Sequence, residues 1–575
     1  MSISHLLLFL FLVTLNTLRF VGLNDVPPGY YVDEAASFTQ IWCLGEDGRD
    51  DLGRLLPLFA PGEANAIYTP AYLYGQVLWS FLFGHSVAAF RAFSGFISCL
   101  TILFLYLWVQ KKAGRHIAFY VALSASIMPW VFQFSRIAWD PPVATFFLVL
   151  ALWATGLSRQ RWLAAIPLAL AAYSYSPMRL MAIPFLFFLP TLSWKDKVRI
   201  FLVFIVICIP LLIYMLDPQF MHRANYLALW GKTFGNPFGH ESVLGLALIF
   251  IKNIGLFFTP HFLFLTGDPE VRHSIQTFGM LSWLDGLAYS GALFFLLLAL
   301  GKKESARLST DQLQLLSVAC LGIVLAFIPA ALTREGLPNA LRALAAWPFF
   351  ALLTGLALSI IEQRLGNKRT LLGAVLTSVI FYSFYLWDYL YVYPKRAEKA
   401  FLSNQGRIAG AYPKLLAQTM NCEQLRKVPP LRFENPIKLN QALSFAEGGT
   451  GSPYLGRAWP IQEPWGRWSE GNWADLEIPM PDIKPQSIQL KLRAFVSGAL
   501  LEQKVEVWMN GAYQTTIILR QFENNVINLV IPKNIQKDAL LWLDFYLPNA
   551  QSPNALGLGA DRRSLGIGIE TLEFH

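Results

Sequence analysis

Long apolar runs separated by short polar loops fill the first two thirds of the chain. Each run is long enough, or nearly so, to cross the hydrocarbon core of a membrane as a helix. The runs occupy residues 6–23, 86–110, 116–134, 141–157, 162–176, 178–193, 199–216, 283–300, 313–332, 341–361 and 370–391. The pattern predicts about eleven transmembrane helices, of which the two beside the turn at 173–179 are short. The first run lacks a basic n-region and a small-x-small cleavage site, so we expect it to be retained.

Basic residues gather in every second loop between these runs. The clusters are Lys111, Lys112 and Arg115; Arg159 and Arg161; residues 195–199; Lys302, Lys303 and Arg307; and residues 364–369. Because positively charged loops remain in the cytoplasm, all five clusters are predicted to lie there. The other loops then face the extracytoplasmic side, and they contain Asp33 and Glu34, Asp140, and residues 217–282 and 333–339.

Two further apolar segments do not fit this alternation as full crossings. Counting residues 243–258 as a span would place Lys302 and Lys303 outside, so we interpret this segment as re-entrant or lying along the interface. Residues 53–83 are interrupted by prolines and interleaved with Tyr and Trp. This composition favours an interfacial helical loop.

After residue 391 the pattern changes. Residues 393–430 are polar and predicted to be helical. Alternating segments rich in Val, Ile, Leu and Phe follow at 487–496, 505–509, 514–519, 526–531, 540–547 and 565–574, and Asn510-Gly511 is typical of a hairpin turn. We therefore predict a membrane domain (1–392), a helical linker (393–430) and an extracytoplasmic β-sandwich (431–575).

Composition agrees with an integral membrane protein. The 575 residues are 55% hydrophobic and 14% charged, with a mean hydropathy of +0.43. The net charge of +9 comes from short clusters between apolar runs, so it reports topology and does not indicate nucleic-acid binding. The five cysteines show no CxxC or metal-ligand spacing, and a Cys43–Cys422 bridge is one pairing to consider.

Short motifs occur in order around the predicted outer loops. They lie at residues 30–36, 70–79, 83–91, 132–140, 267–273 and 337–344. In order and spacing they resemble membrane glycosyltransferases of the GT-C fold, close to the protein mannosyltransferase and aminoarabinose transferase group (glycosyltransferase family 39-like). The resemblance covers about residues 5–350, and its most diagnostic element is the Asp33-Glu34 pair.

The resemblance implies transfer of a sugar from a polyprenyl-phosphate-linked donor on the outer face, usually with inversion. The implied partners are that donor, a lipid, glycan or protein acceptor, and membrane lipids. An acceptor hydroxyl is a poor nucleophile at neutral pH, so a carboxylate must take its proton. By resemblance to the family's first-loop aspartate, Asp33 is the candidate base. Glu34 would orient the acceptor, a metal or Asp33, and a helix N-terminal charge is an equal alternative.

Asp140 is a candidate for the second acidic residue that GT-C enzymes often use near the donor. Its Trp-Asp-Pro-Pro setting also fits a cap of the following helix, because proline is favoured in a first helical turn. His261, Asp268 and His273 lie in one outer loop that, together with Glu34, would complete a divalent-metal site. Relatives differ in holding a metal, and the spacing here is not diagnostic, so metal dependence stays open.

A lipid-phosphate leaving group needs cationic stabilisation, and the guanidinium fork suits phosphate oxygens. The candidate phosphate-binding residues are Arg136, Arg272 and Arg342, with Arg91 and Arg334 behind them. For each, an interfacial anchor or a topology charge is an equal alternative.

Two other functions share these features. A transporter or flippase for a lipid-linked glycan would place charges within the spans, whereas here the ionisable residues collect in outer loops. A surface-glycan polymerase or ligase would need the same base and phosphate site. In the C-terminal region, the Trp-rich segment 456–471 and residues 561–567 are similar to jelly-roll appendages of glycan enzymes, where tryptophans either bind sugars or fill the core. A bacterial inner membrane or similar plasma membrane suits this topology.

Overall fold

The computed structural model describes residues 3–62, 67–157, 160–216, 224, 227–230, 241–301, 308–334, 336–401, 408–427, 437–455, 458–459, 462–481, 483–533, 535–537 and 540–575. The chain forms two compact units: Met1–Ala228 with Val243–Arg426, and Leu229–Ser242 with Lys427–His575. Several residues used in the sequence analysis lie outside the described residues: Arg159, Lys302, Lys303, Arg307, Gly456 and Arg457.

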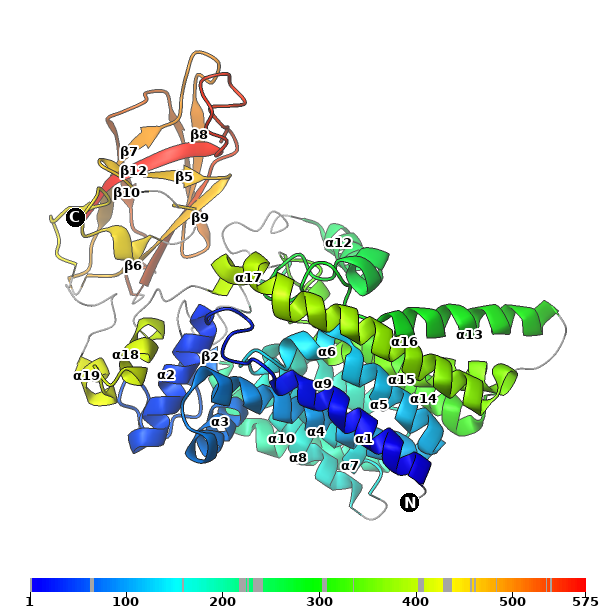
Figure 1. The fold of residues 1–575 in the computed structure, drawn as a ribbon. Coiled ribbons are helices and arrows are strands. Elements are labelled where there is room, and N and C mark those ends of the chain that lie inside the picture. Colours follow the sequence, from blue (N-terminus) through cyan, green and yellow to red (C-terminus); the bar gives the residue numbers. More distant parts are fainter. Residues whose placement is uncertain are drawn as a thin grey trace. The chain divides into compact units, whose positions relative to one another are not determined.

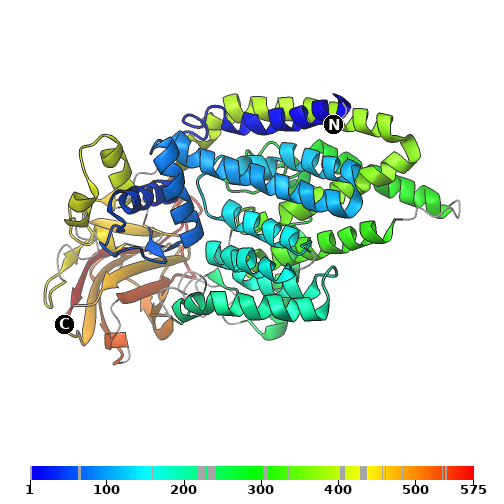
Figure 2. The same cartoon turned by 90° about the horizontal axis from the view of Figure 1, so that it is seen from below.

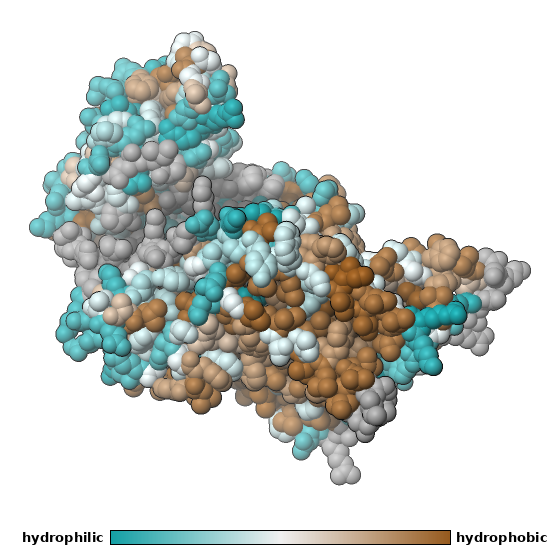
Figure 3. Space-filling view, viewed as in Figure 1, coloured by the Kyte–Doolittle hydropathy of each residue, from teal (hydrophilic) through white to brown (hydrophobic). Residues whose placement is uncertain are grey.

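The first unit is a bundle of apolar helices that run side by side (Figures 1 and 2). Its long elements are α1 (Ile3–Thr17), α4 (Val87–Ala113), α5 (Arg115–Ile127), α7 (Pro141–Ala154), α8 (Ala165–Ser174), α9 (Ser176–Phe188), α10 (Trp194–Tyr214), α12 (Val243–Leu256), α13 (Trp283–Gly301), α14 (Thr310–Ala331), α15 (Trp347–Leu365) and α16 (Asn367–Trp387). Small residues permit close packing: a Cβ on Gly355 of α15 would collide with Val121 of α5. Figure 3 shows apolar side chains gathered over α1 and α16, as expected for a surface that faces lipid.

Among the described residues, six helical segments are long and apolar enough to cross a membrane, and four apolar helices are shorter. One of the six is Val243–Leu265, which the sequence analysis interprets as re-entrant. This criterion uses length and composition only, so both the count of eleven spans and the re-entrant segment remain predictions. The predicted run 116–134 is divided at Met128-Pro129 into α5 and α6 (Pro129–Phe134), because proline begins a new helix there.

Short helices gather at one end of the bundle, on the left in Figure 1. They are α2 (Val32–Asp47), α3 (Pro70–Phe83), α18 (Tyr412–Leu416) and α19 (Cys422–Lys427). Two short strands, β1 (Ala60–Pro61) and β2 (Ile67–Tyr68), pair between α2 and α3. The end of α3 exposes Leu78, Phe81, Leu82 and Phe83, which agrees with the interfacial position expected from the sequence.

A disulfide joins α2 to α19 through Cys43 and Cys422, 379 residues apart in sequence. Arg426 reinforces this joint by donating two hydrogen bonds to the Asp47 carboxylate, at 2.5 and 2.8 Å. These contacts hold the end of the predicted linker on the helical unit. The cysteine pairing that the sequence left open is therefore present in the structure.

The described part of the second unit is a sandwich of two antiparallel sheets. One sheet has the order β10-β7-β12-β5-β4, with β3 also pairing with β12, and the other has the order β6-β11-β8-β9. The strands are β3 (Leu443–Ser444), β4 (Gln462–Glu463), β5 (Gly466–Glu470), β6 (Trp473–Pro479), β7 (Ser487–Ala494), β8 (Gln503–Met509), β9 (Ala512–Leu519), β10 (Asn525–Val530), β11 (Leu540–Tyr546) and β12 (Leu565–Phe574). The predicted fold class, a helical membrane-type domain followed by a β-sandwich, is confirmed.

Local pattern accounts for most of the sandwich. On β7 and β8, side chains alternate between buried and partly exposed, so each strand sends one face into the core. Asn510 and Gly511 both have positive φ, 47° and 80°, in the turn between β8 and β9, as the hairpin prediction requires. The sequence analysis missed β5 and β6, because their tryptophans and charges obscure the alternation. Trp459 and Trp468 are buried, whereas Trp465 stacks on Arg493.

The cysteine pairing predicts a specific labelling result. In protein denatured without reductant, a maleimide should label three thiols, those of Cys99, Cys208 and Cys320, and reductant should release two more. Intact-mass spectrometry of the labelled chain gives the count. A Cys43→Ser, Cys422→Ser double variant should give three labels under both conditions, and five labels on the unreduced wild type would contradict the pairing.

Candidate active site

The acidic pair lies at the start of α2, where a buried ion pair fixes the helix. The Glu34 carboxylate accepts from Arg91 of α4 through Nε at 3.0 Å and Nη2 at 2.9 Å. It also accepts from the backbone N–H of Ala138 at 3.0 Å and of Tyr31 at 3.3 Å. Both side chains are fully buried. Glu34 therefore joins three segments: the first outer loop, α4 and the second outer loop.

Two arginines that the sequence analysis assigned to phosphate bind backbone carbonyls. Arg91 donates its remaining N–H groups to the carbonyls of Leu23, Pro27 and Gly29 at 2.7 to 3.2 Å. Arg136 donates to the carbonyls of Arg19, Gly22 and Val26 at 2.7 to 3.3 Å. Both are fully buried. This geometry replaces their predicted phosphate role by a structural one, because together they hold the loop that leads to α2.

Asp33 is in the first turn of α2, beside the buried Glu34. Successive helical residues point about 100° apart, so the two carboxylates leave the helix in different directions. Asp33 is partly exposed, and its backbone carbonyl accepts a hydrogen bond from Tyr68 at 2.8 Å. The rigid part of the pair is thus Glu34, and Asp33 is the carboxylate that solvent reaches.

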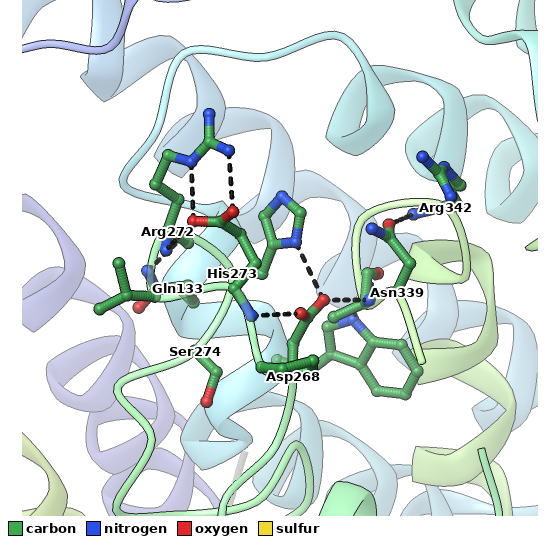
Figure 4. A network of polar contacts seen from close by, with 12 residues as sticks. Gln133, Asp268, Arg272, His273, Ser274, Asn339 and Arg342 are labelled. Atoms are coloured by element: carbon green, nitrogen blue, oxygen red, sulfur yellow. Dashed lines mark hydrogen bonds and ion pairs between the residues drawn. The ribbon is translucent and has the colours of Figure 1, made fainter. Parts of the chain in front are cut away.

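A second acidic residue, Asp268, orients His273. Its carboxylate contacts His273 Nδ1 at 2.9 Å and accepts from the backbone N–H of Ala340 at 2.6 Å and of Glu270 at 2.8 Å (Figure 4). Asp268 is buried and His273 nearly so. A carboxylate that holds one ring nitrogen fixes the imidazole's orientation and leaves the other nitrogen for chemistry.

Arg272 connects this loop to the start of α2. Its guanidinium forms a bidentate pair with Glu270, with both distances 2.9 Å, and lies 4.0 Å above the Tyr31 ring. The hydrogen bonds from Arg272 lower the pKa of Glu270 to about 2. Aromatic contacts extend the junction, since Trp139 lies 6.0 Å from Tyr31 and 5.7 Å from His273. The start of α2, the loop that contains Trp139 and the 268–274 loop therefore meet at one place.

Asp140 is the N-terminal capping residue of α7, but its side chain does not cap the helix. Its carboxylate is partly exposed and acts electrostatically on Arg179 of α9. Arg179 was not among the sequence candidates. The feature that could have drawn attention to it is the turn at 173–179, where this arginine is a single cation among apolar residues at the start of a short helix.

Arg342 lies on the other side of His273 from Arg272 (Figure 4). Its Nη1 donates to Thr333 at 2.9 Å, and its backbone N–H donates to Asn339 at 2.9 Å. It also lines a small, mainly apolar pocket with Pro141 of α7, Pro177 of α9 and Pro329 of α14. A mainly apolar pocket with an arginine in its lining suits an anion that carries an apolar chain.

The predicted metal ligands are not brought together. Among the described residues no group of three His, Cys, Asp or Glu side chains could hold a metal ion. Both oxygens of Glu34 accept N–H groups, and His261 is exposed on the π-helical segment η4 (His261–Leu265). Only Asp268 and His273 meet, so we derive no step through a metal.

The chain is similar to one family model and to several solved structures. A family model described as a domain of unknown function (DUF7024) matches residues 459–575. A search of curated proteins gave no match. Matched structures include ArnT from Cupriavidus metallidurans bound to undecaprenyl phosphate, at 14% identity and a TM-score of 0.43, covering 74% of each chain. Another is the archaeal oligosaccharyltransferase AglB from Archaeoglobus fulgidus with an inhibitory peptide and a dolichol-phosphate, at 15% identity and a TM-score of 0.41, covering 76% of this chain and 62% of that one.

At these identities and TM-scores we take no residue role from the matched structures. The function proposed below is based on this chain's own residues.

The buried pair predicts a large loss of stability when one partner is removed. Replacing Glu34 with Gln leaves the Arg91 cation buried without a counter-charge, which typically costs about 3–5 kcal/mol. We expect a clearly lower thermal unfolding midpoint for the detergent-solubilised protein. Glu46→Gln is the matched control, because Glu46 is exposed on the same helix and should unfold like the wild type. Equal midpoints for Glu34→Gln and the wild type would contradict the structural role.

The pKa of Glu270 predicts a defined dependence of stability on pH. The folded pKa, about 2, lies below the unfolded value of 4.5, so this group stabilises the fold above pH 4.5. The contribution falls as pH drops from 4.5 toward 2. Glu270→Gln should therefore lower the unfolding midpoint at pH 7, and the difference from the wild type should shrink at pH 3. A difference that stays constant across this range would show that Glu270 does not act through its charge.

Proposed function

We propose that the chain is an integral-membrane glycosyltransferase that takes a sugar from a polyprenyl-phosphate-linked donor and acts on the extracytoplasmic face with inversion. The observation that carries the proposal is the junction at the start of α2. There a partly exposed carboxylate, Asp33, lies two residues after Tyr31, whose ring is stacked against the Arg272 guanidinium. A base close to a phosphate-binding cation is the combination that glycosyl transfer from a lipid phosphate requires.

Asp33 would take the proton of the acceptor hydroxyl as that oxygen attacks the anomeric carbon. Its position suits a base, because α2 is held by the Glu34–Arg91 pair and by the hydrogen bond from Tyr68. A rigid helix start limits the base to a narrow set of positions, which reduces the entropic cost of reaching the reactive geometry. Attack on one face, with the lipid phosphate departing from the other, gives inversion.

The departing phosphate needs positive charge but no proton. Arg272 and Arg342 lie on either side of His273 and are both partly exposed, so they are the candidates for this role. Their present partners, Glu270 and Thr333, would be exchanged for phosphate oxygens when the donor binds. Asp140 and Arg179 lie at the adjoining helix starts, where they would contact the sugar. The apolar pocket beside Arg342 would take the first part of the lipid chain.

The extracytoplasmic position is supported by the disulfide. Disulfides persist in oxidising compartments and are rare in the cytoplasm. Because Cys43 lies on the same helix as Asp33, the active-site end of the bundle would face the periplasm or the cell exterior. This is the side that the basic loops predict independently. The C-terminal domain follows Cys422 directly and would lie on the same side.

The decisive experiment compares cells that express matched levels of wild type, Asp33→Asn and Asp25→Asn. Loss of the base should reduce transfer by roughly 10²–10⁴-fold. Mass spectrometry should then show one sugar missing from a glycan or lipid product and its polyprenyl-linked donor accumulating. Asp25 is an exposed aspartate in the same loop and serves as the control that keeps wild-type products.

Other outcomes separate the competing functions. Unchanged products with a displaced lipid-linked pool would favour a flippase. Loss of glycan chain length without loss of a sugar type would favour a polymerase or ligase. Near wild-type turnover by Asp33→Asn would remove Asp33 as the base.

A further inference from the structure

An open pocket of about 190 Å³ lies at the C-terminal end of α16, apart from the junction described above. Four aromatic residues and one acidic residue line it: Phe278, Trp283, Phe384, Trp387 and Asp388. Trp283 begins α13, and Trp387 ends α16, where the predicted spans meet the outer surface of the membrane. The predicted spans therefore put the pocket at the depth of phospholipid headgroups.

Three of the aromatic rings are exposed. Trp283, Phe384 and Trp387 are 43%, 58% and 61% exposed. Trp and Tyr are common at membrane interfaces as isolated anchors. Here, however, the rings share one concave pocket, with Trp283 lying 6.2 Å from Phe278 and 6.1 Å from Phe384. Ring faces gathered in this way attract a cation.

The base of the pocket carries an ion pair. Asp388, on the π-helical turn η6 (Asp388–Val392), is only 8% exposed and accepts a hydrogen bond from Thr277 at 2.8 Å. Its other oxygen pairs with Arg396 of α17 (Tyr393–Phe401). The Arg396 side chain is 30% exposed, so part of this cation reaches the surface. Asp388, which lines the pocket, and Arg396, which pairs with it, together form a dipole.

We propose that this pocket binds the headgroup of a zwitterionic phospholipid that carries an ammonium group, as phosphatidylethanolamine does. The ammonium would lie against the ring faces and the Asp388 carboxylate, and the phosphate would contact Arg396. A zwitterion matches an ion pair because each charge meets its opposite and no net charge is buried. The acyl chains would continue along the exposed apolar side chains of α16, among them Leu376, Val379 and Ile380.

The bound lipid would contact the segment that leads to His273. Thr277 lies four residues after His273, and Tyr393, five residues after Asp388, donates a hydrogen bond to the Val271 carbonyl at 2.9 Å. Gln133 donates to the same Tyr393 hydroxyl at 2.9 Å. A headgroup in the pocket would thus brace one side of the site loop. The proposal of lipid binding does not depend on the reaction that the site performs.

The test uses the purified full chain in detergent, incubated with equal amounts of dioleoyl phosphatidylethanolamine and dioleoyl phosphatidylglycerol. Native mass spectrometry then measures which lipid each variant retains. The wild type should retain phosphatidylethanolamine in preference, and Trp387→Ala should reduce that retention by about 10-fold, the loss expected for a partly desolvated cation–π contact. Asp388→Asn should reduce it as well.

Trp194→Ala is the matched control, because Trp194 is a 67% exposed tryptophan on α10 that does not line the pocket. It should retain lipid as the wild type does. Equal retention of the two lipids, preferential retention of phosphatidylglycerol, or wild-type retention by Trp387→Ala would each overturn the proposal. Trp387 is largely exposed, so its variant remains decisive even if Asp388→Asn does not fold.

Discussion

The buried ion pair between Glu34 and Arg91 is the interaction on which the candidate site depends. Two charges removed from water are costly unless every donor and acceptor is satisfied. Here the five N–H groups of Arg91 and both oxygens of Glu34 all have partners. Those partners come from the first outer loop, α4 and the second outer loop. One pair therefore sets the relative position of three segments that meet at one end of the bundle.

The arginines at this end of the bundle fall into two groups that differ in burial and in their partners. Arg91 and Arg136 are fully buried and bind carbonyls of the chain, so they stabilise loops that have no regular secondary structure. Arg272 and Arg342 are partly exposed and hydrogen-bond to side chains, those of Glu270 and Thr333, which the proposed reaction would exchange for phosphate oxygens. Covalent bracing adds to this rigidity, because Cys43 and Cys422 join the far end of α2 to α19. A site built from loops thus acquires the fixed geometry that catalysis needs.

Several elements could be predicted because they depend on local pattern. The apolar runs correspond to the bundle helices, and six alternating segments correspond to β7–β12. Asn510-Gly511 forms the predicted hairpin turn, since both residues adopt positive φ readily. Strands β5 and β6 were missed because their tryptophans and charges hide the alternation. Arg179 was missed because the sequence around a single cation does not show which distant residues lie beside it.

The sequence by itself determined the apolar helices, the β-sandwich and the acidic pair at the start of a helix. These follow from composition and periodicity, which act over a few residues. Only the tertiary structure decided that Glu34 and Arg91 form a buried pair, that Asp268 holds His273, and that Arg272 lies on Tyr31. Except for the Asp268–His273 pair, these partners lie 57 or more residues apart in sequence. Whether an arginine binds carbonyls or faces solvent depends on which segments pack around it, and no local pattern encodes that.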